Sequence, residues 1–271
     1  MAVITGGASG IGRALGVELA ARGCEVVLAD RQVELAELAA ASIRDAGGKA
    51  LAVELDVRDR AAFRRVAEEA KARAGRIDFL FNNAGIGVGA EIERCDPEDW
   101  DEVVDVNLRG VIHGVEAVYP LMVAQRSGHI VNTASMAGLV PEAGEAGYTA
   151  TKHAVVGLTK ALRVEARRHG VRASALCPGA IRTPILTGGR FGRIRLAGVS
   201  AERVAALWER TRPMAPDAFA QQALDAVLRD EPFIVVPRWW KSLWYLDRLS
   251  PSLSLRLWEV LFRRALIDLQ G

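Results

Sequence analysis

A glycine-rich turn near the start of the chain constrains its fold more than any other feature. Residues 5–12 read TGGASGIG, directly after the apolar run Ala2–Thr5 and directly before a stretch with helical periodicity. Glycine tolerates the positive φ of a tight turn, and without side chains the N–H groups at a helix start lie open to an anion. A glycine-rich segment can be a simple turn, but a turn between a first strand and a first helix favours a dinucleotide-binding site.

Seven short apolar runs alternate with amphipathic stretches. The runs are rich in Val, Ile and Leu and show little period-two alternation, which is typical of strands buried on both faces. They are Ala2–Thr5, Glu25–Ala29, Ala50–Leu55, Phe79–Phe81, His129–Thr133, Val171–Leu176 and Phe233–Val236. Segments such as Ala14–Arg22, Val33–Ala46 and Ala61–Ala74 have helical spacing. Residues 1–236 are therefore predicted to be a Rossmann-type α/β domain, a doubly wound, seven-stranded parallel sheet with helices on both faces. The basic, glycine-rich segment 188–199 is expected to be a mobile loop or short helices.

Composition excludes several other classes of protein. The 271 residues carry a formal net charge of only +2, which gives no reason to expect nucleic acid as a partner. Cys24, Cys95 and Cys177 lie far apart, and no CxxC or Cys/His cluster occurs, so we expect neither disulfides nor a metal site. The N-terminus lacks a signal-peptide pattern and no apolar run reaches about 18 residues, so we expect a cytoplasmic protein.

Acidic residues follow the second and third runs. Asp30 can accept hydrogen bonds from the hydroxyls of an adenosine ribose, and its charge would repel a 2′-phosphate, which favours NAD over NADP. Arg31 follows directly and could pair with such a phosphate, so NADP stays open. Asp30 could instead cap the following helix. Asp56 and Val57 close the third strand, where a side chain can meet an adenine ring.

A second group of polar residues carries acid–base chemistry. Tyr148 and Lys152, in the segment YTATK, lie one helical turn apart on one face. Ser135 lies 13 residues before Tyr148, just beyond the fifth run, and Asn107 lies on an expected helix between the fourth and fifth runs. Alcohol oxidation needs a base for the hydroxyl proton and ketone reduction needs an acid for the carbonyl oxygen. A tyrosine can serve in both directions.

These motifs occur in the order and at the spacings of the short-chain dehydrogenase/reductase family, which the chain closely resembles. The matching segments are TGGASGIG, Asp56-Val57, the NNAG segment at 82–85, Asn107, Ser135, YTATK, and Cys177-Pro178-Gly179 leading to Ile181-Arg182-Thr183-Pro184. The resemblance is close over residues 2–185 and continues loosely to Val236. It implies an enzyme that moves a hydride between a nicotinamide cofactor, NAD or NADP, and an alcohol or ketone carbon.

The resemblance also implies a catalytic tetrad of Asn107, Ser135, Tyr148 and Lys152. Tyr148 would be the acid/base; its unperturbed pKa of about 10 makes a phenolate at pH 7 cost about 4 kcal/mol. The Lys152 ammonium would lower that cost and bind the nicotinamide ribose. Ser135 would hold the substrate oxygen, and Asn107 would hold a water that links Lys152 to solvent.

The cofactor site implied by the same motifs draws on many segments. Its expected residues are Gly6, Ser9, Gly10, Ile11, Gly12, Asp30, Arg31, Asp56, Val57, Asn83, Ala84, Gly85, Tyr148, Lys152, Pro178, Gly179, Ile181 and Thr183. Family members often form dimers or tetramers through the helices that carry Asn107 and Tyr148. The resemblance therefore implies a homodimer or homotetramer.

Residues 237–271 depart from the family, many of whose members end near the seventh strand. This stretch contains Trp239, Trp240, Trp244 and Trp258, and Ser250-Pro251 is typical of an N-cap followed by a first helical residue. We expect a helical extension of the same domain. Its helices either pack on the protein and cover the mouth of the active site, or lie in a membrane interface as a peripheral contact.

An apolar covering of the site suits a bulky apolar alcohol or ketone, such as a steroid, retinoid or terpenoid. Two other functions stay open at this point. An NADP-dependent reductase of ketoacyl thioesters or other carbonyls would prefer a basic residue in place of Ser9 and no carboxylate at Asp30. A non-catalytic dinucleotide-sensing module would be expected to lose part of the tetrad.

Overall fold

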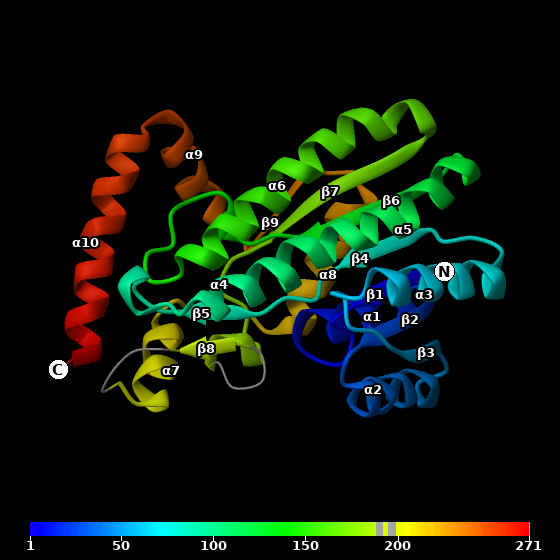
Figure 1. The fold of residues 1–271 in the computed structure, drawn as a ribbon, viewed down its shortest axis with the longest axis horizontal. Helices are drawn as coiled ribbons and strands as arrows, with labels where there is room; N and C mark the ends of the chain where they lie inside the picture. The colour runs from blue at the N-terminus through cyan, green and yellow to red at the C-terminus, as the bar shows by residue number, and fades with distance from the viewer. Residues whose placement is uncertain (188–191, 195–198, 271) are drawn as a thin grey trace.

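The computed structural model describes residues 1–187, 192–194 and 199–270, and its layers are those of an α/β fold (Figure 1). Seven parallel strands form one sheet in the order β3-β2-β1-β4-β6-β7-β9. They are β1 (Ala2–Thr5), β2 (Glu25–Asp30), β3 (Lys49–Glu54), β4 (Phe79–Asn82), β6 (Gly128–Thr133), β7 (Val171–Pro178) and β9 (Phe233–Val236). The predicted fold class is confirmed, and each expected apolar run overlaps one of these strands.

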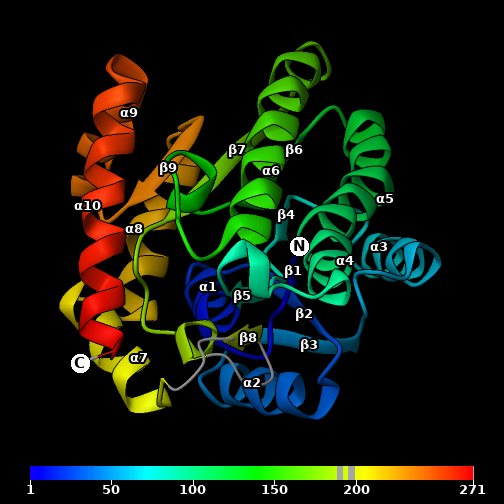
Figure 2. The same ribbon diagram turned by 60° about the vertical axis from the view of Figure 1, so that its left-hand side comes forward.

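Helices cover both faces of this sheet (Figure 2). On one face, α1 (Gly10–Ala21), α2 (Val33–Asp45) and α8 (Pro216–Leu228) share a buried cluster with β1 and β2. On the other face, α3 (Arg60–Ala74), α5 (Gly110–Gln125) and α6 (Ala146–Ala166) bury the opposite sides of the strands. Two further helices, α4 (Pro97–Val104) and α7 (Ala201–Arg210), lie near the carboxyl edge.

Helix α3 illustrates how local sequence sets these elements. Its N-cap Asp59 accepts a hydrogen bond from the N–H of Ala62 at 2.9 Å, and Gly75 ends the helix with a φ of 74°. The buried residues Phe63, Val66, Ala67 and Ala70 follow the i, i+3, i+4, i+7 pattern of one helical face. Charged residues occupy the other sides, so the helix can pack in only one orientation.

The order of the strands reverses next to β1, and this reversal positions the site. From β1 the chain crosses outward to β2 and β3, and then returns to place β4 on the other side of β1. The connections that leave β1 and β4 therefore diverge over opposite faces of the sheet. They open a crevice at the carboxyl ends of the strands, which is where ligands bind in open α/β sheets.

A small second sheet was not expected from the sequence. Strand β5 (Gly87–Gly89) pairs in parallel with β8 (Gly192–Ile194). The mobile loop or short helices expected over 188–199 are therefore wrong for these three residues, and residues 188–191 and 195–198 lie outside the described part. Three residues are too few to show a periodic pattern in the sequence. Such a strand is recognised only from the strand with which it pairs.

The C-terminal extension packs on the same chain. After β9, η7 (Arg238–Trp240), α9 (Lys241–Leu249) and α10 (Pro251–Gln270) follow, with α10 along an outer edge of the molecule (Figures 1 and 2). The rings of Trp244 and Phe233 lie 5.1 Å apart between centroids, and Trp258 packs against the same buried cluster. As expected, α10 starts at Pro251. The first of the two expected arrangements, packing on the protein, is therefore the one in the structure.

The close approach of α5 to the sheet yields a stability prediction. A Cβ at Gly114 would lie 2.0 Å from the Oδ1 of Asn82 and 2.8 Å from the Phe63 ring. We expect Gly114→Ala to lower the free energy of unfolding by about 1–3 kcal/mol through overpacking, measured by urea denaturation. Gly157→Ala is the matched control, because nothing lies within 4 Å of its Cβ position. Improved helix propensity should make that variant about 0.5–1 kcal/mol more stable. Equal stability of the two variants would contradict the packing argument.

Candidate active site

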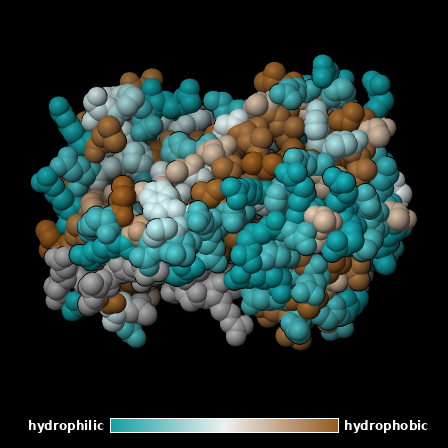
Figure 3. Space-filling model, in the orientation of Figure 1, coloured by the Kyte–Doolittle hydropathy of each residue, from teal (hydrophilic) through white to brown (hydrophobic). Residues whose placement is uncertain are grey.

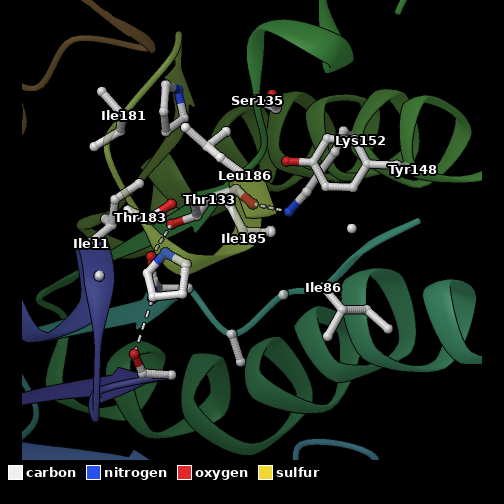
Figure 4. Close-up of a pocket in the computed structure, with 18 of the residues that line it drawn as sticks. Ile11, Ile86, Thr133, Ser135, Tyr148, Lys152, Ile181, Thr183, Ile185 and Leu186 are labelled. Atoms are coloured by element: carbon white, nitrogen blue, oxygen red, sulfur yellow. Dashed lines mark hydrogen bonds between the residues drawn. The ribbon is translucent and has the colours of Figure 1, made fainter. Parts of the chain in front are cut away.

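One elongated pocket lies at the carboxyl edge of the sheet, and it gathers most of the expected site residues (Figure 4). The expected residues that line it are Gly6, Ser9, Gly10, Ile11, Asp30, Arg31, Asp56, Val57, Asn83, Ala84, Gly85, Ser135, Tyr148, Lys152, Pro178, Gly179, Ile181 and Thr183. Gly12 and Asn107 do not line it. Both lie behind residues that do.

The glycine turn between β1 and α1 is shaped by contacts that exclude side chains. Gly6 and Gly10 have φ values of 66° and 51°, in the left-handed region that favours glycine. A Cβ at Gly12 would lie 2.1 Å from the carbonyl oxygen of Gly6. A Cβ at Gly10 would lie 3.2 Å from the Thr183 side chain, so Thr183 closes over the turn. The start of α1 therefore presents its N–H groups directly to the pocket.

Hydrogen bonds tie this turn to the end of β4. The hydroxyl of Thr5 accepts hydrogen bonds from the N–H groups of Asn83 at 3.0 Å and Ala84 at 3.1 Å. The side-chain amide of Asn83 donates to the carbonyl oxygen of Thr5 at 3.1 Å. The expected Asn83-Ala84-Gly85 segment thus forms one wall of the pocket, opposite the glycine turn.

Asp30 ends β2 with its carboxylate beside the glycine turn. It is buried and accepts hydrogen bonds from the N–H of Ala8 at 3.1 Å and of Gln32 at 3.0 Å. The N-cap of α2 is Gln32, so Asp30 lies before the cap position rather than in it. A fixed carboxylate here can accept further hydrogen bonds, and it places a negative charge at this end of the pocket.

Asp56 has a different partner. Its carboxylate accepts hydrogen bonds from the backbone N–H and the guanidinium of Arg58, and this guanidinium lowers the pKa of the carboxyl. Its neighbour Val57 is buried, and the carbonyl oxygen of Val57 lies 2.9 Å from Nδ1 of His113. This end of the pocket therefore has an apolar wall flanked by an internally paired carboxylate.

Tyr148, Ser135 and Lys152 meet at the other end of the pocket, and in Figure 4 the Tyr148 hydroxyl points into it. Burial raises the pKa of Tyr148, the charge of Glu145 raises it further, and a hydrogen bond with Ser135 lowers it. Lys152 is 3% exposed; its ammonium donates to the carbonyl oxygen of Thr133 at 2.9 Å and lies 5.4 Å from the Tyr148 ring centroid. Burial lowers the pKa of Lys152 to about 8.

Asn107 supports this arrangement from behind. It lies in a π-helical turn, Asp105–Arg109, between α4 and α5, and it is fully buried. Its amide accepts a hydrogen bond from the N–H of Ile86 and donates one to the carbonyl oxygen of Ile86, both at 2.9 Å. A Cβ at Gly85 would lie 3.2 Å from the Asn107 oxygen and 3.5 Å from the Lys152 nitrogen. Asn107 thus holds the β4 loop against Lys152, and its role as a water holder stays a prediction.

Two glutamates in the pocket were not expected. Glu142 and Glu145 lie in the segment before Tyr148 and line the same cavity. Burial raises the pKa of Glu142 to about 7, and burial together with the charge of Glu142 raises the pKa of Glu145 to about 8. Among the described residues, neither carboxyl has a hydrogen-bonding or ion-pair partner. The sequence held one signal for them, since Glu145 lies one helical turn before Tyr148.

Apolar side chains complete this end of the pocket. Met136 follows Ser135, Ile185 and Leu186 come from η5 (Pro184–Thr187), and Trp208 and Trp240 come from α7 and η7. The Trp240 indole lies against Gly179, where a Cβ would be 2.3 Å from its Nε1. The C-terminal extension therefore contributes directly to the pocket. Only the tryptophan content of the tail hinted at this contact.

Comparisons with known proteins agree with this geometry. Residues 1–190 match the family model described as short chain dehydrogenase. Levodione reductase from Leifsonia aquatica is 43% identical over 187 residues, which cover 68% of this chain and 70% of that protein. A short chain dehydrogenase/reductase from Burkholderia phymatum, solved in complex with NAD, has a TM-score of 0.82 at 33% identity and covers 93% of this chain and 94% of its own. A metagenomic short-chain oxidoreductase, solved in complex with NADP, has a TM-score of 0.65 at 31% identity, with coverages of 87% and 95%.

The chain therefore belongs to the short-chain dehydrogenase family, as its motifs predicted. It is an oxidoreductase that acts on CH–OH groups.

The two glutamates yield a prediction for stability against pH. Both folded-state pKa values lie above the ordinary 4.5 of a glutamate, so the stability that the pair contributes is complete below about pH 4.5. It is lost as the pH rises through about 7 and 8. We expect the Glu142→Gln/Glu145→Gln variant to be more stable than the parent at about pH 9 and to lose less stability between about pH 6 and 9. Urea unfolding across this range measures the effect.

The matched control is Glu165→Gln, which removes an exposed carboxylate near the far end of α6. It should leave the dependence of the free energy of unfolding on pH unchanged. A double variant with the same pH dependence as the parent would show that the two carboxyls titrate normally.

Proposed function

We propose that this chain is an NAD-preferring alcohol dehydrogenase or ketone reductase with Tyr148 as the acid/base. The observation that carries the proposal is the meeting of Tyr148, Ser135 and Lys152 in one pocket with the glycine turn. The residues present fit NAD(P), because Gly6 and Gly10 line the pocket without side chains and the start of α1 offers N–H groups to a pyrophosphate. When bound, the cofactor supplies or accepts the hydride.

The protein's own residues would manage the proton. In ketone reduction, the Tyr148 hydroxyl donates its proton to the carbonyl oxygen as that oxygen becomes an alkoxide; in oxidation, the phenolate takes the alcohol proton. Burial keeps Tyr148 protonated, which suits the donor role. The Lys152 ammonium, held 5.4 Å from the ring centroid, favours the phenolate that forms after donation. Ser135 holds the substrate oxygen where charge develops.

Asp30 supports the preference for NAD. Its buried carboxylate is fixed by two backbone N–H groups at the end of β2, where an adenosine ribose would lie. A 2′-phosphate there would meet a like charge. Arg31 follows Asp30 on the surface, and NADP stays the alternative cofactor.

The lining of the pocket near Tyr148 supports a substrate that is a bulky apolar alcohol or ketone, of steroid-, retinoid- or terpenoid-like size. Ile185, Leu186, Trp208 and Trp240 offer it an apolar wall. With a pKa of about 8, Glu145 is mostly neutral at pH 7, whereas Glu142, with a pKa of about 7, is partly ionised there. The ketoacyl or carbonyl reductase alternative is disfavoured by Asp30. The dinucleotide-sensing alternative is disfavoured by the complete set of acid–base residues.

The proposal also includes the domain organisation, the oligomeric state and the location of the protein. Residues 1–236 form the dinucleotide-binding and catalytic unit, and residues 237–271 extend the same domain. Figure 3 shows hydrophobic residues gathered across the region where Figure 1 places α5 and α6, which supports a homodimer or homotetramer through these helices. A cytoplasmic location stays a prediction.

The cofactor preference can be tested by exchanging one carboxylate. We expect Asp30→Ser to raise the affinity for NADPH relative to NADH by about tenfold or more, because a like charge is removed from the 2′-phosphate. Fluorescence titration with each cofactor measures the ratio. Asp45→Ser, at the exposed far end of α2, is the control and should leave the ratio unchanged. A parent protein that prefers NADPH would overturn the preference assigned to Asp30.

The acid/base assignment is tested by Tyr148→Phe. We expect kcat/KM for ketone reduction to fall by about 10²- to 10⁴-fold, since the proton donor is lost, while NADH affinity stays within a few-fold. The assay uses ketones graded in size and polarity, and the parent should favour bulky apolar ones. Tyr245→Phe, on the exposed side of α9, is the control. Full turnover by Tyr148→Phe would refute the role, and no turnover by the parent, despite tight NADH binding, would favour the sensor alternative.

A further inference from the structure

The outer face of α10 carries apolar and basic side chains in alternation. Leu253, Val260 and Ile267 recur every seven residues, so they lie on one side of the helix, and they are 53%, 47% and 68% exposed. Arg256 and Arg264 lie between them on the same side and are exposed. These five residues are called the outer stripe below.

The opposite side of α10 is fixed against the protein. Trp258 packs on the buried cluster below α6, and Phe262 lies against Gly144, where a Cβ would be 3.4 Å from its ring. Asp268, which borders the outer stripe one turn after Arg264, forms an ion pair with Arg210 of α7. These contacts set the rotation of the helix, so the outer stripe must face away from the protein. Figures 1 and 2 agree in placing α10 at an outer edge.

The C-terminal extension carries a concentrated positive charge. Residues 237–271 hold six basic and three acidic side chains, although the whole chain has a net charge of only +2. Within the part of the chain that the structure describes, Arg256 and Arg264 form no ion pair, and Arg263 pairs only with exposed Glu259 on its own helix. The outer stripe therefore offers uncompensated cations beside exposed apolar side chains.

We propose that the outer stripe docks on an anionic lipid surface, with α10 lying parallel to the membrane. Arginine guanidinium groups pair with lipid phosphates while Leu253, Val260 and Ile267 enter the boundary of the acyl chains. Leu249, at the end of α9 and four residues before Leu253 in the chain, is also 86% exposed. Among the described residues, no helix is long and apolar enough to cross a bilayer, so the contact is peripheral.

Charge complementarity selects lipid over a second copy of this chain. A symmetric contact between two outer stripes would bring the arginines of one copy against those of the other. An anionic bilayer instead supplies a negative charge for each guanidinium. The proposal does not depend on the reaction catalysed in the pocket.

The test is sedimentation of the full-length protein with vesicles. Vesicles of phosphatidylcholine alone should leave the protein in the supernatant, and vesicles that also contain phosphatidylglycerol should pellet it. Binding should weaken as the salt concentration rises, because the arginine contacts are screened. Equal binding to both vesicle types, or binding to neither, would overturn the proposal.

Two pairs of variants separate the outer stripe from general surface properties. Leu253→Ser/Ile267→Ser should abolish most of the binding, whereas Leu38→Ser/Leu228→Ser should bind like the parent, because those residues are similarly exposed, at 69% and 56%, but lie on α2 and α8. Arg256→Gln/Arg264→Gln should weaken binding by about fivefold for each arginine. Arg64→Gln/Arg65→Gln on α3 removes the same charge elsewhere and should have no such effect.

Two further measurements separate this proposal from the proposed function and from contact with a second copy of the chain. Melting temperature, NADH affinity and turnover of a water-soluble ketone should be unchanged in both outer-stripe variants, which distinguishes failure of this proposal from failure of the proposed function. Light scattering should give the same oligomeric state for parent and variants. A parent that binds no vesicles but dissociates on Leu253→Ser/Ile267→Ser would assign the outer stripe to a second copy and overturn the lipid proposal.

Discussion

The hydrogen-bonded link between the ends of β1 and β4 is the constraint on which the site depends. Thr5 accepts from the N–H groups of Asn83 and Ala84, and Asn83 donates back to the Thr5 carbonyl oxygen. This link lies where the strand order reverses, so it fixes the glycine turn and the segment after β4, which border the crevice, relative to each other. The glycine turn depends on it too, since Gly6 lies against Ala84 with no space for a Cβ.

Burial sets the protonation states of the ionisable groups at the end of the pocket that holds Tyr148. Removing water favours the neutral form of every ionisable group there, which raises the pKa of Tyr148, Glu142 and Glu145 and lowers that of Lys152. In the proposed reaction, Tyr148 is protonated before it donates, and the neighbouring Lys152 ammonium offsets the charge of the phenolate that forms. The apolar walls at this end of the pocket therefore also set the protonation states of the groups around it.

The C-terminal extension contributes residues both to the pocket and to the outer surface of the molecule. Trp240 contributes to the pocket, Phe262 of α10 lies on Gly144 between the two glutamates, and Leu253 faces outward. One helix thus supports the segment before Tyr148 with one side and leaves the other side exposed. The two arrangements expected for the tail are compatible, because they use opposite sides of the same helix.

The sequence by itself determined the sheet, the glycine turn, and the identity of the family. These depend on local patterns: apolar runs, a strand-to-helix turn that only glycine can form, and a helical pair such as Tyr148 and Lys152. The tertiary structure decided what depends on contacts between distant segments. The Asn107 amide is occupied by Ile86, β5 exists only because β8 pairs with it, and Glu142 and Glu145 acquire raised pKa values only once burial removes their water. Burial and pairing partners are not local properties of a sequence, so spacing could place Glu145 near Tyr148 but could not predict its raised pKa.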